Sequence, residues 1–147
     1  MSQQYVIFKL DNEYFGIEIS HVMEIICLQE VFKVPDTPQY VEGLINLRGK
    51  VYTIFNLRKR FNLPQVNTGK DDHKILIINV NSTSLGFIVD SVDEIKSIES
   101  ENIEPSPESV SKFDKKYISG AVNIEDKLIF LLDLETLIKE SHENSTP

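Results

Sequence analysis

The sequence predicts a mainly all-β protein made of two small lobes, each with about five short strands. Short apolar segments alternate with tight turn signals along most of the 147 residues, which is typical of small barrels or sandwiches. Part of the first half recurs in the second half, and a polar segment separates the two. Apolar residues make up 41% of the chain and charged residues 26%, which is ordinary for a folded domain.

Four β-hairpins are predicted from pairs of apolar segments that flank turn-forming residues. The pairs are 5–10 with 13–19, 44–47 with 50–56, 75–80 with 85–89, and 118–124 with 127–132. Single strands are expected at 31–34 and 95–98. A helical turn is expected at 57–61, and a short terminal helix at 134–140 should precede a fraying tail at 141–147.

The strongest internal signal is a duplication. GLINLRGKVYTIFNL at 43–57 aligns with GAVNIEDKLIFLLDL at 120–134, with four of fifteen positions identical and seven more pairing apolar with apolar. GIEISHVMEI at 16–25 likewise aligns with GFIVDSVDEI at 86–95. The two offsets, 77 and 70, differ by seven, so the halves share one plan with different loop lengths.

The duplication predicts a single domain over 1–147 with two lobes. We expect lobe one at about 13–63, a linker at 64–73 and lobe two at about 74–140, with the N-terminal strand as a candidate to cross between them. A lobe of about 65 residues would be only marginally stable alone. The lobes are therefore expected to share a buried hydrophobic seam, which is a natural place for a groove.

Charge and composition exclude several classes of protein. The net charge is −8, and residues 63–147 carry the excess, with sixteen acidic and eight basic residues. A nucleic-acid binder would show a basic face, and none is evident, so no nucleic-acid partner is expected. The N-terminus lacks a signal peptide, no apolar run is long enough to span a bilayer, and the single Cys27 fits a reducing compartment, so we expect a cytoplasmic protein.

Enzyme chemistry and metal binding have little support in the sequence. Ser20 and His21 are adjacent, but no nucleophile elbow accompanies them. The three histidines and one cysteine lack metal-ligand spacing, and no nucleotide-binding fingerprint is present. We therefore expect no catalytic residue, no metal and no cofactor. A small hydrolase or ligand-binding barrel would require a deep pocket with converging polar groups, which the sequence does not identify.

A resemblance to a known family extends from about Tyr5 to Ile138. It rests on YFGIEISHVMEI, VPDTPQYVEGLINLRGKVYTIFNLRKRF, LGFIVDSVDEI, IEPSP and YISGAVNIEDKLIFLLDLETLI, which together resemble the CheW-like domain family of chemotaxis coupling proteins. The resemblance implies two SH3-like five-stranded β-barrels around a shared hydrophobic seam, with a short C-terminal helix. The segment TIFNLR at 53–58 departs from the family, which often has Pro first and Asp fourth, so a salt bridge from that acid is not expected.

The resemblance also implies an activity. Members of the family are non-enzymatic adaptors that couple the cytoplasmic tips of transmembrane chemoreceptors to the regulatory domain of a histidine kinase in signalling arrays. The chain would be a monomer in isolation, and receptors would recruit it to the inner face of the membrane without direct insertion. The alternatives are an adaptor of a non-flagellar pathway, such as twitching, and a piece of a larger adaptor or kinase. A chain that runs from Met1 to shortly after the last helix argues against a kinase piece.

Arg48 is the leading candidate for partner recognition. Tight turns prefer Gly, Asn, Asp or Ser, and Gly49 already meets that need. The equivalent turn is Glu125-Asp126, so the scaffold tolerates the opposite charge there. A planar guanidinium binds a carboxylate in a bidentate manner, and the family's functional arginine falls on this position. The alternative is a solvated turn residue.

Val22 and Glu24 are further candidates, because they fall on positions that the family uses to contact the receptor. The same residue types recur in the second half, which also fits a scaffold role, and Ile25 is expected to be scaffold. Arg58 and Arg60 are candidate partner contacts because arginine is favoured at interfaces, with a solvated helical turn as the alternative.

Gly43 and Gly120 occupy equal places in the repeat. We interpret both as structural glycines, at backbone positions that a side chain would distort. Replacing Gly43 is therefore expected to abolish binding through the fold alone.

Overall fold

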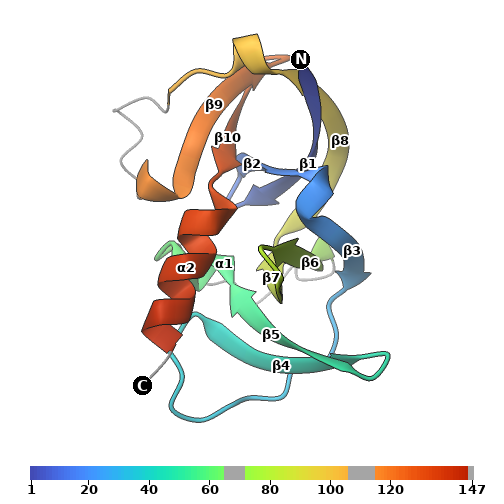
Figure 1. Ribbon diagram of the computed structural model, residues 1–147, viewed down its shortest axis with the longest axis vertical. Helices are drawn as coiled ribbons and strands as arrows, with labels where there is room; N and C mark the ends of the chain where they lie inside the picture. The colour runs from blue at the N-terminus through green and yellow to red at the C-terminus, as the bar shows by residue number, and fades with distance from the viewer. Residues whose placement is uncertain (65–71, 106–114, 146–147) are drawn as a thin grey trace.

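The computed structural model describes residues 1–64, 72–105 and 115–145 and shows a mainly β fold with few helices (Figure 1). The strands are β1 (Ser2–Leu10), β2 (Glu13–Glu18), β3 (Val22–Cys27), β4 (Val41–Leu47), β5 (Lys50–Asn56), β6 (Lys74–Val80), β7 (Thr83–Val89), β8 (Ser91–Glu99), β9 (Ile118–Ile124) and β10 (Lys127–Leu132). The helices are α1 (Leu57–Arg60) and α2 (Leu134–Ser145), with 3-10 turns η1 (Ile19–His21), η3 (Ser100–Asn102) and η4 (Lys115–Tyr117).

The strands of the described residues form two five-stranded sheets, each curled into an SH3-like barrel. One sheet has the order β8-β1-β2-β10-β9, and we call it the terminal barrel because it holds the first and last strands. The other has the order β3-β6-β7-β5-β4, and we call it the central barrel. Figure 1 shows the barrels stacked along the long axis, with α2 running from the terminal barrel along the side of the central one.

The four predicted β-hairpins are confirmed, as β1–β2, β4–β5, β6–β7 and β9–β10. Each has a two-residue turn in which both residues have positive φ, the pattern of a type I′ turn. The turns are Asp11-Asn12, Arg48-Gly49, Asn81-Ser82 and Glu125-Asp126. Since a type I′ turn matches the right-handed twist of paired strands, local turn chemistry explains these hairpins.

The two barrels do not follow the order of the chain. Hairpin β1–β2 completes the barrel that contains β8, β9 and β10, whereas hairpin β6–β7 completes the barrel of β3, β4 and β5. Each hairpin joins its barrel through a parallel strand pair, β2 with β10 in the terminal barrel and β7 with β5 in the central barrel. The two repeats therefore exchange their hairpins, and this strand order contradicts the expected lobe boundaries of 13–63 and 74–140. The chain crosses between barrels at η1 and again at Asp90.

Some local expectations need correction. The strand expected at 31–34 is reduced to one bridge, Phe32 with Leu44, because Pro35 and the positive φ of Asp36 end the extended chain. The structure instead has β3 directly after η1, and β8 is longer than the expected 95–98. Helix α2 continues to Ser145 where a fraying tail was expected, and Leu134, Leu137 and Ile138 in its first half pack on the core. Most of the predicted linker, 65–71, lies outside the described residues.

Three apolar clusters form the core. One lies inside the terminal barrel and one inside the central barrel. The largest lies between the barrels and takes residues from both, together with the buried face of α2: among its members are Phe8, Phe15, Phe130, Phe55, Phe87, Leu76, Leu137 and Ile138. This cluster is the shared hydrophobic seam that was expected.

Candidate partner-binding surface

Strand β3 forms one edge of the central barrel and presents apolar side chains to solvent. Val22 is half-buried and packs against the shared core. Met23 is 51% exposed and Ile25 is 40% exposed, so the expected scaffold role of Ile25 does not describe its position. The residue types of this strand do not distinguish its two faces, since the exposed positions are the apolar Met23 and Ile25 and the half-buried ones include Glu24. A bulge lies between Val22 and Glu24, where the pairing with β6 shifts.

The structure brings Arg48 and Glu24 together. Arg48, at the tip of the β4–β5 hairpin, donates a hydrogen bond from Nη2 to Oε2 of Glu24 on β3. Because β3 and β4 are the two edges of the same sheet, this ion pair spans the open side of the central barrel. The hydrogen bond to Glu24 raises the pKa of the Arg48 guanidinium further above its ordinary value. The carboxylate expected for Arg48 is therefore present within the chain.

The terminal barrel closes the same gap with a lysine between two carboxylates. Glu125, equivalent in the repeat to Arg48, lies near Glu94, equivalent to Glu24, and Lys96 joins them at 3.3 and 3.0 Å. Hydrogen bonds to Glu94 and then Glu125 raise the pKa of Lys96. The opposite charge at the equivalent turn is thus explained by Lys96 within the chain, so the turn comparison alone does not require an external partner for Arg48.

Arg48 combines an unfavourable backbone conformation with an exposed side chain. Its φ of 52° lies in the left-handed region, which costs a residue with a β-carbon about 1–2 kcal/mol relative to glycine. Asn or Gly would suit the position better. The side chain is 69% exposed, so it remains accessible while it contacts Glu24. Glu125 at the equivalent turn has the same conformation, with φ of 53°, so the cost belongs to this type of hairpin and does not by itself assign a role to Arg48.

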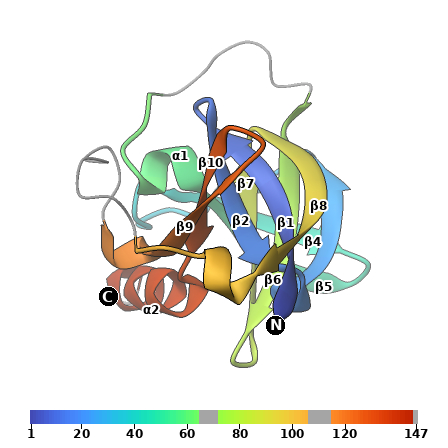
Figure 2. The same cartoon turned by 90° about the horizontal axis from the view of Figure 1, so that it is seen from above.

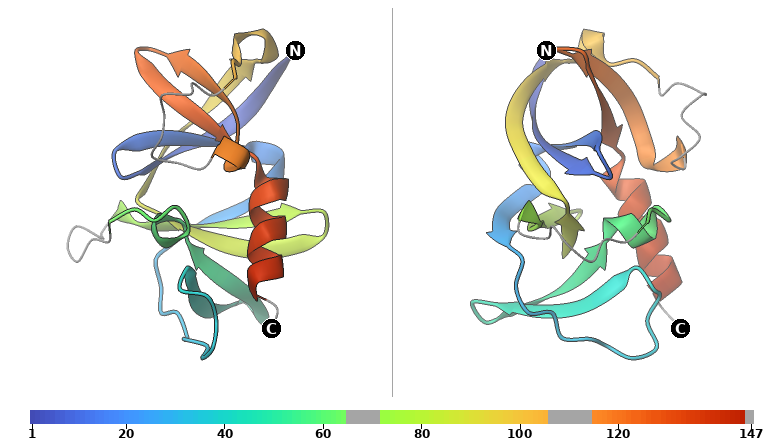
Figure 3. Two further views of the ribbon diagram at one scale, coloured as in Figure 1. Left: turned by 90° about the vertical axis from the view of Figure 1, so that its left-hand side faces the viewer. Right: turned by 180° about the vertical axis from the view of Figure 1, so that it is seen from behind.

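Strands β3 and β8 lie on the same side of the molecule, as Figure 1, the view from above in Figure 2 and the rear view in Figure 3 agree. Strand β8 also exposes an apolar side chain there, since Ile95 is 52% exposed. Val92 is half-buried and, like Val22, packs against the shared core. Equivalent strands of both barrels, which lie on the same side of the molecule, therefore each carry exposed apolar side chains.

Arg58, a candidate partner contact, lies in the interior. It is 8% exposed, and its Nε and Nη2 donate to the two carboxylate oxygens of Asp90 at 2.8 and 2.6 Å. Nη1 donates to the carbonyl oxygen of Pro64 at 2.5 Å, and the Asp11 amide donates to Asp90 Oδ2 at 2.9 Å. Because Asp90 is the second crossing point, this network fastens α1 to the connection between the barrels. The placement favours a structural role for Arg58.

The Asp90 carboxyl has a perturbed pKa as a result. Burial alone would raise this pKa, but hydrogen bonds from Arg58 and from the Asp11 amide outweigh burial and hold the pKa below its ordinary value. His73 is also buried, with Nε2 3.9 Å from Asp90 Oδ1. Asp90 is therefore ionised in the folded protein at neutral pH.

Arg60 lies half-buried between two tyrosine rings. Its guanidinium carbon is 4.8 Å from the centroid of the Tyr40 ring and 4.7 Å from that of Tyr117, a cation–π geometry. Nη2 also donates to the Tyr117 hydroxyl at 2.5 Å. These contacts hold the side chain against the protein, and a partner contact through Arg60 stays a prediction.

Gly43 and Gly120 each lie next to an isolated β-bridge, Phe32 with Leu44 and Glu104 with Ala121. At Gly43, which has φ of 144°, a β-carbon would overlap the carbonyl oxygen of Phe32. At Gly120, a β-carbon would lie 2.7 Å from Ile103 Cγ2 and 3.0 Å from the Glu104 carbonyl oxygen. Both glycines thus allow another segment to approach the backbone closely, which is the geometry a structural role requires.

Within residues 1–64, 72–105 and 115–145, no group of three or more His, Cys, Asp or Glu side chains is placed to hold a metal ion. No helix in those ranges has the length and apolar character needed to cross a membrane.

Comparison with known proteins identifies the family. Residues 4–142 match the CheW-like domain. The chain is 34% identical to the chemotaxis protein CheW of Treponema pallidum, over 91% of this chain and 81% of that protein. It is 31% identical to the chemotaxis protein CheW of Bacillus subtilis, over 99% and 93%. Its fold is similar to the crystal structure of the scaffolding protein TtCheW from Thermoanaerobacter tengcongensis, with a TM-score of 0.84 and 36% identity over 93% of this chain and 88% of that one. This chain therefore belongs to the CheW-like domain family of chemotaxis scaffold proteins.

Proposed function

We propose that this chain is a non-enzymatic adaptor that couples the cytoplasmic tips of transmembrane chemoreceptors to the regulatory domain of a histidine kinase. The observation that carries the proposal is the β3 edge, where exposed Met23 and Ile25 lie beside the accessible ion pair of Glu24 and Arg48. A scaffold of this kind needs two protein-binding surfaces and no catalytic group. The chain would act at the inner face of the membrane, held there by its receptors.

The receptor would contact β3 and the tip of the β4–β5 hairpin. A helical hairpin can place one apolar stripe against Met23 and Ile25, with half-buried Val22 forming the floor of the contact. Arg48 would exchange the carboxylate of Glu24 for one on the receptor, so the internal ion pair holds the arginine ready without burying it. Val22, Glu24 and Arg48 are the residues that we assign to this surface.

The kinase regulatory domain would bind elsewhere, at the barrel ends, through apolar contacts with a polar rim. Coupling requires that both partners bind at once. A change in the receptor then shifts the kinase between active and inactive arrangements, because each arrangement has a different affinity for the adaptor. In an array, many such adaptors would link receptors to kinases.

The experiment is titration calorimetry of the purified chain against a receptor tip fragment and against the kinase regulatory domain. Arg48→Glu and Val22→Ala are compared with Lys50→Glu, which makes the same charge change at an exposed position two residues from Arg48. We expect Arg48→Glu to lose receptor binding, to keep kinase binding and to remain folded by circular dichroism. Lys50→Glu should bind both partners.

Each other outcome has a defined meaning. Loss of kinase binding instead of receptor binding by Arg48→Glu would show that the surfaces are assigned the wrong way round. A folded wild type that binds neither partner would refute the coupling function. Deletion of the chain from its host distinguishes the pathway, since loss of swimming chemotaxis indicates a flagellar system and loss of twitching indicates the alternative.

A further inference from the structure

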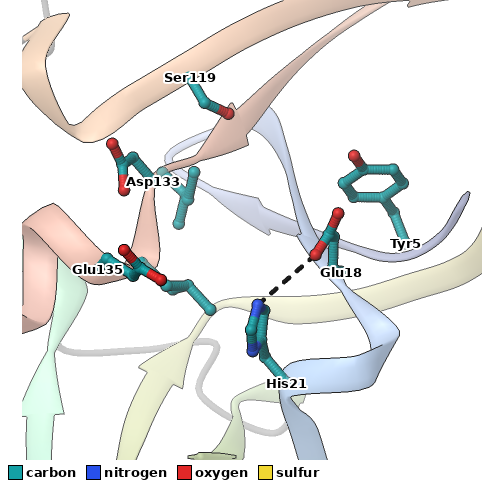
Figure 4. Close-up of a pocket in the computed structure, with 8 residues that line it drawn as sticks. Tyr5, Glu18, His21, Ser119, Asp133 and Glu135 are labelled. Atoms are coloured by element: carbon teal, nitrogen blue, oxygen red, sulfur yellow. Dashed lines mark ion pairs between the residues drawn. The ribbon is translucent and has the colours of Figure 1, made fainter. Parts of the chain in front are cut away.

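A polar pocket opens beside the seam, at the first crossing between the barrels. Its volume is ≈ 300 Å³, and it lies where the terminal barrel meets η1 and the start of α2 (Figure 4). The lining residues are Tyr5, Glu18, His21, Ser119, Leu132, Asp133, Leu134 and Glu135. The pocket is therefore built from four segments that are far apart in the sequence.

The charge of this pocket is negative. Glu18, Asp133 and Glu135 supply three carboxyl groups, and the described residues that line the cavity include no lysine or arginine. Asp133 caps α2, since it accepts hydrogen bonds from the Thr136 amide at 3.1 Å and the Thr136 hydroxyl at 2.9 Å. The partial positive charge at the start of α2 is thus already met by Asp133, and Glu18 and Glu135 supply the remaining negative charge.

The contacts of Glu18 and Glu135 within the chain leave the negative charge of the pocket largely in place. Glu18 Oε2 lies 3.5 Å from His21 Nε2, a contact that is ionic only when the histidine is protonated. Within residues 1–64, 72–105 and 115–145, Glu135 has no ion pair or side-chain hydrogen bond. Ser119 Oγ donates to the carbonyl oxygen of Leu131 at 3.2 Å, so its lone pairs remain available to accept.

Tyr5 provides an independent sign that the cavity takes a ligand. Its side chain is only 7% exposed, and its hydroxyl is directed into the cavity (Figure 4). Among the described residues, no group makes a hydrogen bond with that hydroxyl. Buried polar groups are nearly always hydrogen-bonded, so this hydroxyl takes its partner from whatever fills the cavity, and a ligand that displaces water there must offer a hydrogen bond to it. Burial and then the charge of Glu18 raise the pKa of Tyr5, which keeps the phenol protonated.

We propose that this pocket binds an organic cation, a guanidinium or a primary ammonium group. The carboxylates of Glu18 and Glu135 would accept its N–H groups, and the oxygens of Tyr5 and Ser119 would accept further ones. A guanidinium offers five donors and an ammonium three, and both carry the positive charge that this lining attracts. The cation comes either from a free small molecule or from an arginine or lysine side chain of a peptide. The proposal does not depend on the adaptor function.

The location gives the pocket a structural effect. Tyr5, Glu18 and Ser119 belong to the terminal barrel, His21 lies on the crossing turn η1, and Glu135 lies in the first turn of α2. A bound cation would join these three elements through shared hydrogen bonds. Binding would therefore stabilise the crossing and the terminal helix together.

The test is a titration of the full ¹⁵N-labelled chain by NMR at pH 7 and low salt. The probes are propylguanidine, as a free cation, and the peptide acetyl-Gly-Arg-Gly-amide, each beside a neutral counterpart, which is propylurea for the first and the citrulline peptide for the second. We expect saturable shifts of amides at the lining residues with one or both cationic probes. Binding of propylguanidine alone would identify a free small molecule as the source, and binding of the peptide alone would identify a side chain.

Variants show whether the pocket is responsible. Glu18→Gln should weaken binding about tenfold, and Tyr5→Phe, which keeps the ring in the core, about threefold to tenfold. Glu30→Gln makes the same charge change on an exposed residue outside the pocket and should leave affinity unchanged. The proposal is overturned if neither cationic probe saturates, if the neutral counterparts bind equally well, or if Glu30→Gln weakens binding as much as Glu18→Gln. Thermal melting checks that each variant is folded.

Discussion

Replacing Arg58 with methionine should destabilise the protein strongly, because it leaves the charge of Asp90 partly buried without its partner. Removing one member of a buried ion pair costs roughly 3–5 kcal/mol. The Asp90 side chain keeps 19% of its exposure, so we take the lower end, about 3 kcal/mol. For a chain of this length, that loss corresponds to a fall of roughly 10 °C in melting temperature.

The assay is urea unfolding at pH 7, followed by circular dichroism, with Lys59→Met as the matched control. Lys59 lies in the same turn of α1 and pairs with Glu42 at 2.8 Å, but both side chains keep more than a fifth of their exposure. A pair of that kind is worth about 1 kcal/mol or less. Lys59→Met should therefore shift the urea midpoint far less than Arg58→Met.

A second variant isolates the cause. Adding Asp90→Asn to Arg58→Met removes the uncompensated charge but keeps an oxygen that accepts from the Asp11 amide. The double variant should therefore recover about 1–2 kcal/mol relative to the single one. The reasoning is refuted if Arg58→Met costs less than about 1 kcal/mol, or if the double variant is no more stable than Arg58→Met.

Three further predictions concern the fold. The lowered pKa of Asp90 contributes stability that is present above the ordinary carboxyl value, about 4, and is lost as pH falls through the lower folded value, so Asp90→Asn should flatten the decline of the urea midpoint between pH 5 and pH 2. An unchanged slope would contradict this. Gly43→Ala should lower the melting temperature far more than Gly49→Ala, where φ is 86° but no atom lies within 4 Å of the added carbon; the reverse order would refute the packing argument. Phe130→Ala should cost roughly 3–5 kcal/mol and unfold both barrels in one transition, because Phe130 lies in the shared core; two separate transitions would show independent barrels.

Much of the fold could be predicted because the hairpins depend on short-range chemistry. Asp11-Asn12 favours a type I′ turn, and apolar residues on either side set the register. The exchange of hairpins could not be predicted in the same way. Equivalent strands of the two repeats have similar apolar faces, so β2 fits against β10 as well as against β5, and the choice depends on contacts across the whole chain.

Only part of the candidate partner-binding surface could be predicted from the sequence, because local patterns identify exposed turns but not contacts between distant segments. The exposed turn identified Arg48, but its contact with Glu24 depends on how a barrel closes, which no local pattern reveals. Arg58 follows β5 in a basic run, LRKR, which resembles a solvated turn until Asp90 is placed beside it. Nothing in the sequence indicated that Tyr5 lines a pocket, since an aromatic residue in an apolar strand is usually a core residue. Only the position of its hydroxyl in the structure distinguishes Tyr5 from an ordinary core residue.

The exchange of hairpins has a consequence for how the two halves diverged. Two copies of one repeat that traded hairpins as separate chains would form a domain-swapped dimer, and twofold symmetry would then force the same residue onto both equivalent positions. Joining the copies in one chain removes that constraint while keeping the interlocked architecture. The two equivalent turns accordingly carry Arg48 on one barrel and Glu125 on the other. The two barrels share one architecture but have different surface residues. The molecule can therefore bind two different partners at equivalent surfaces, whereas a symmetric dimer would have two identical surfaces.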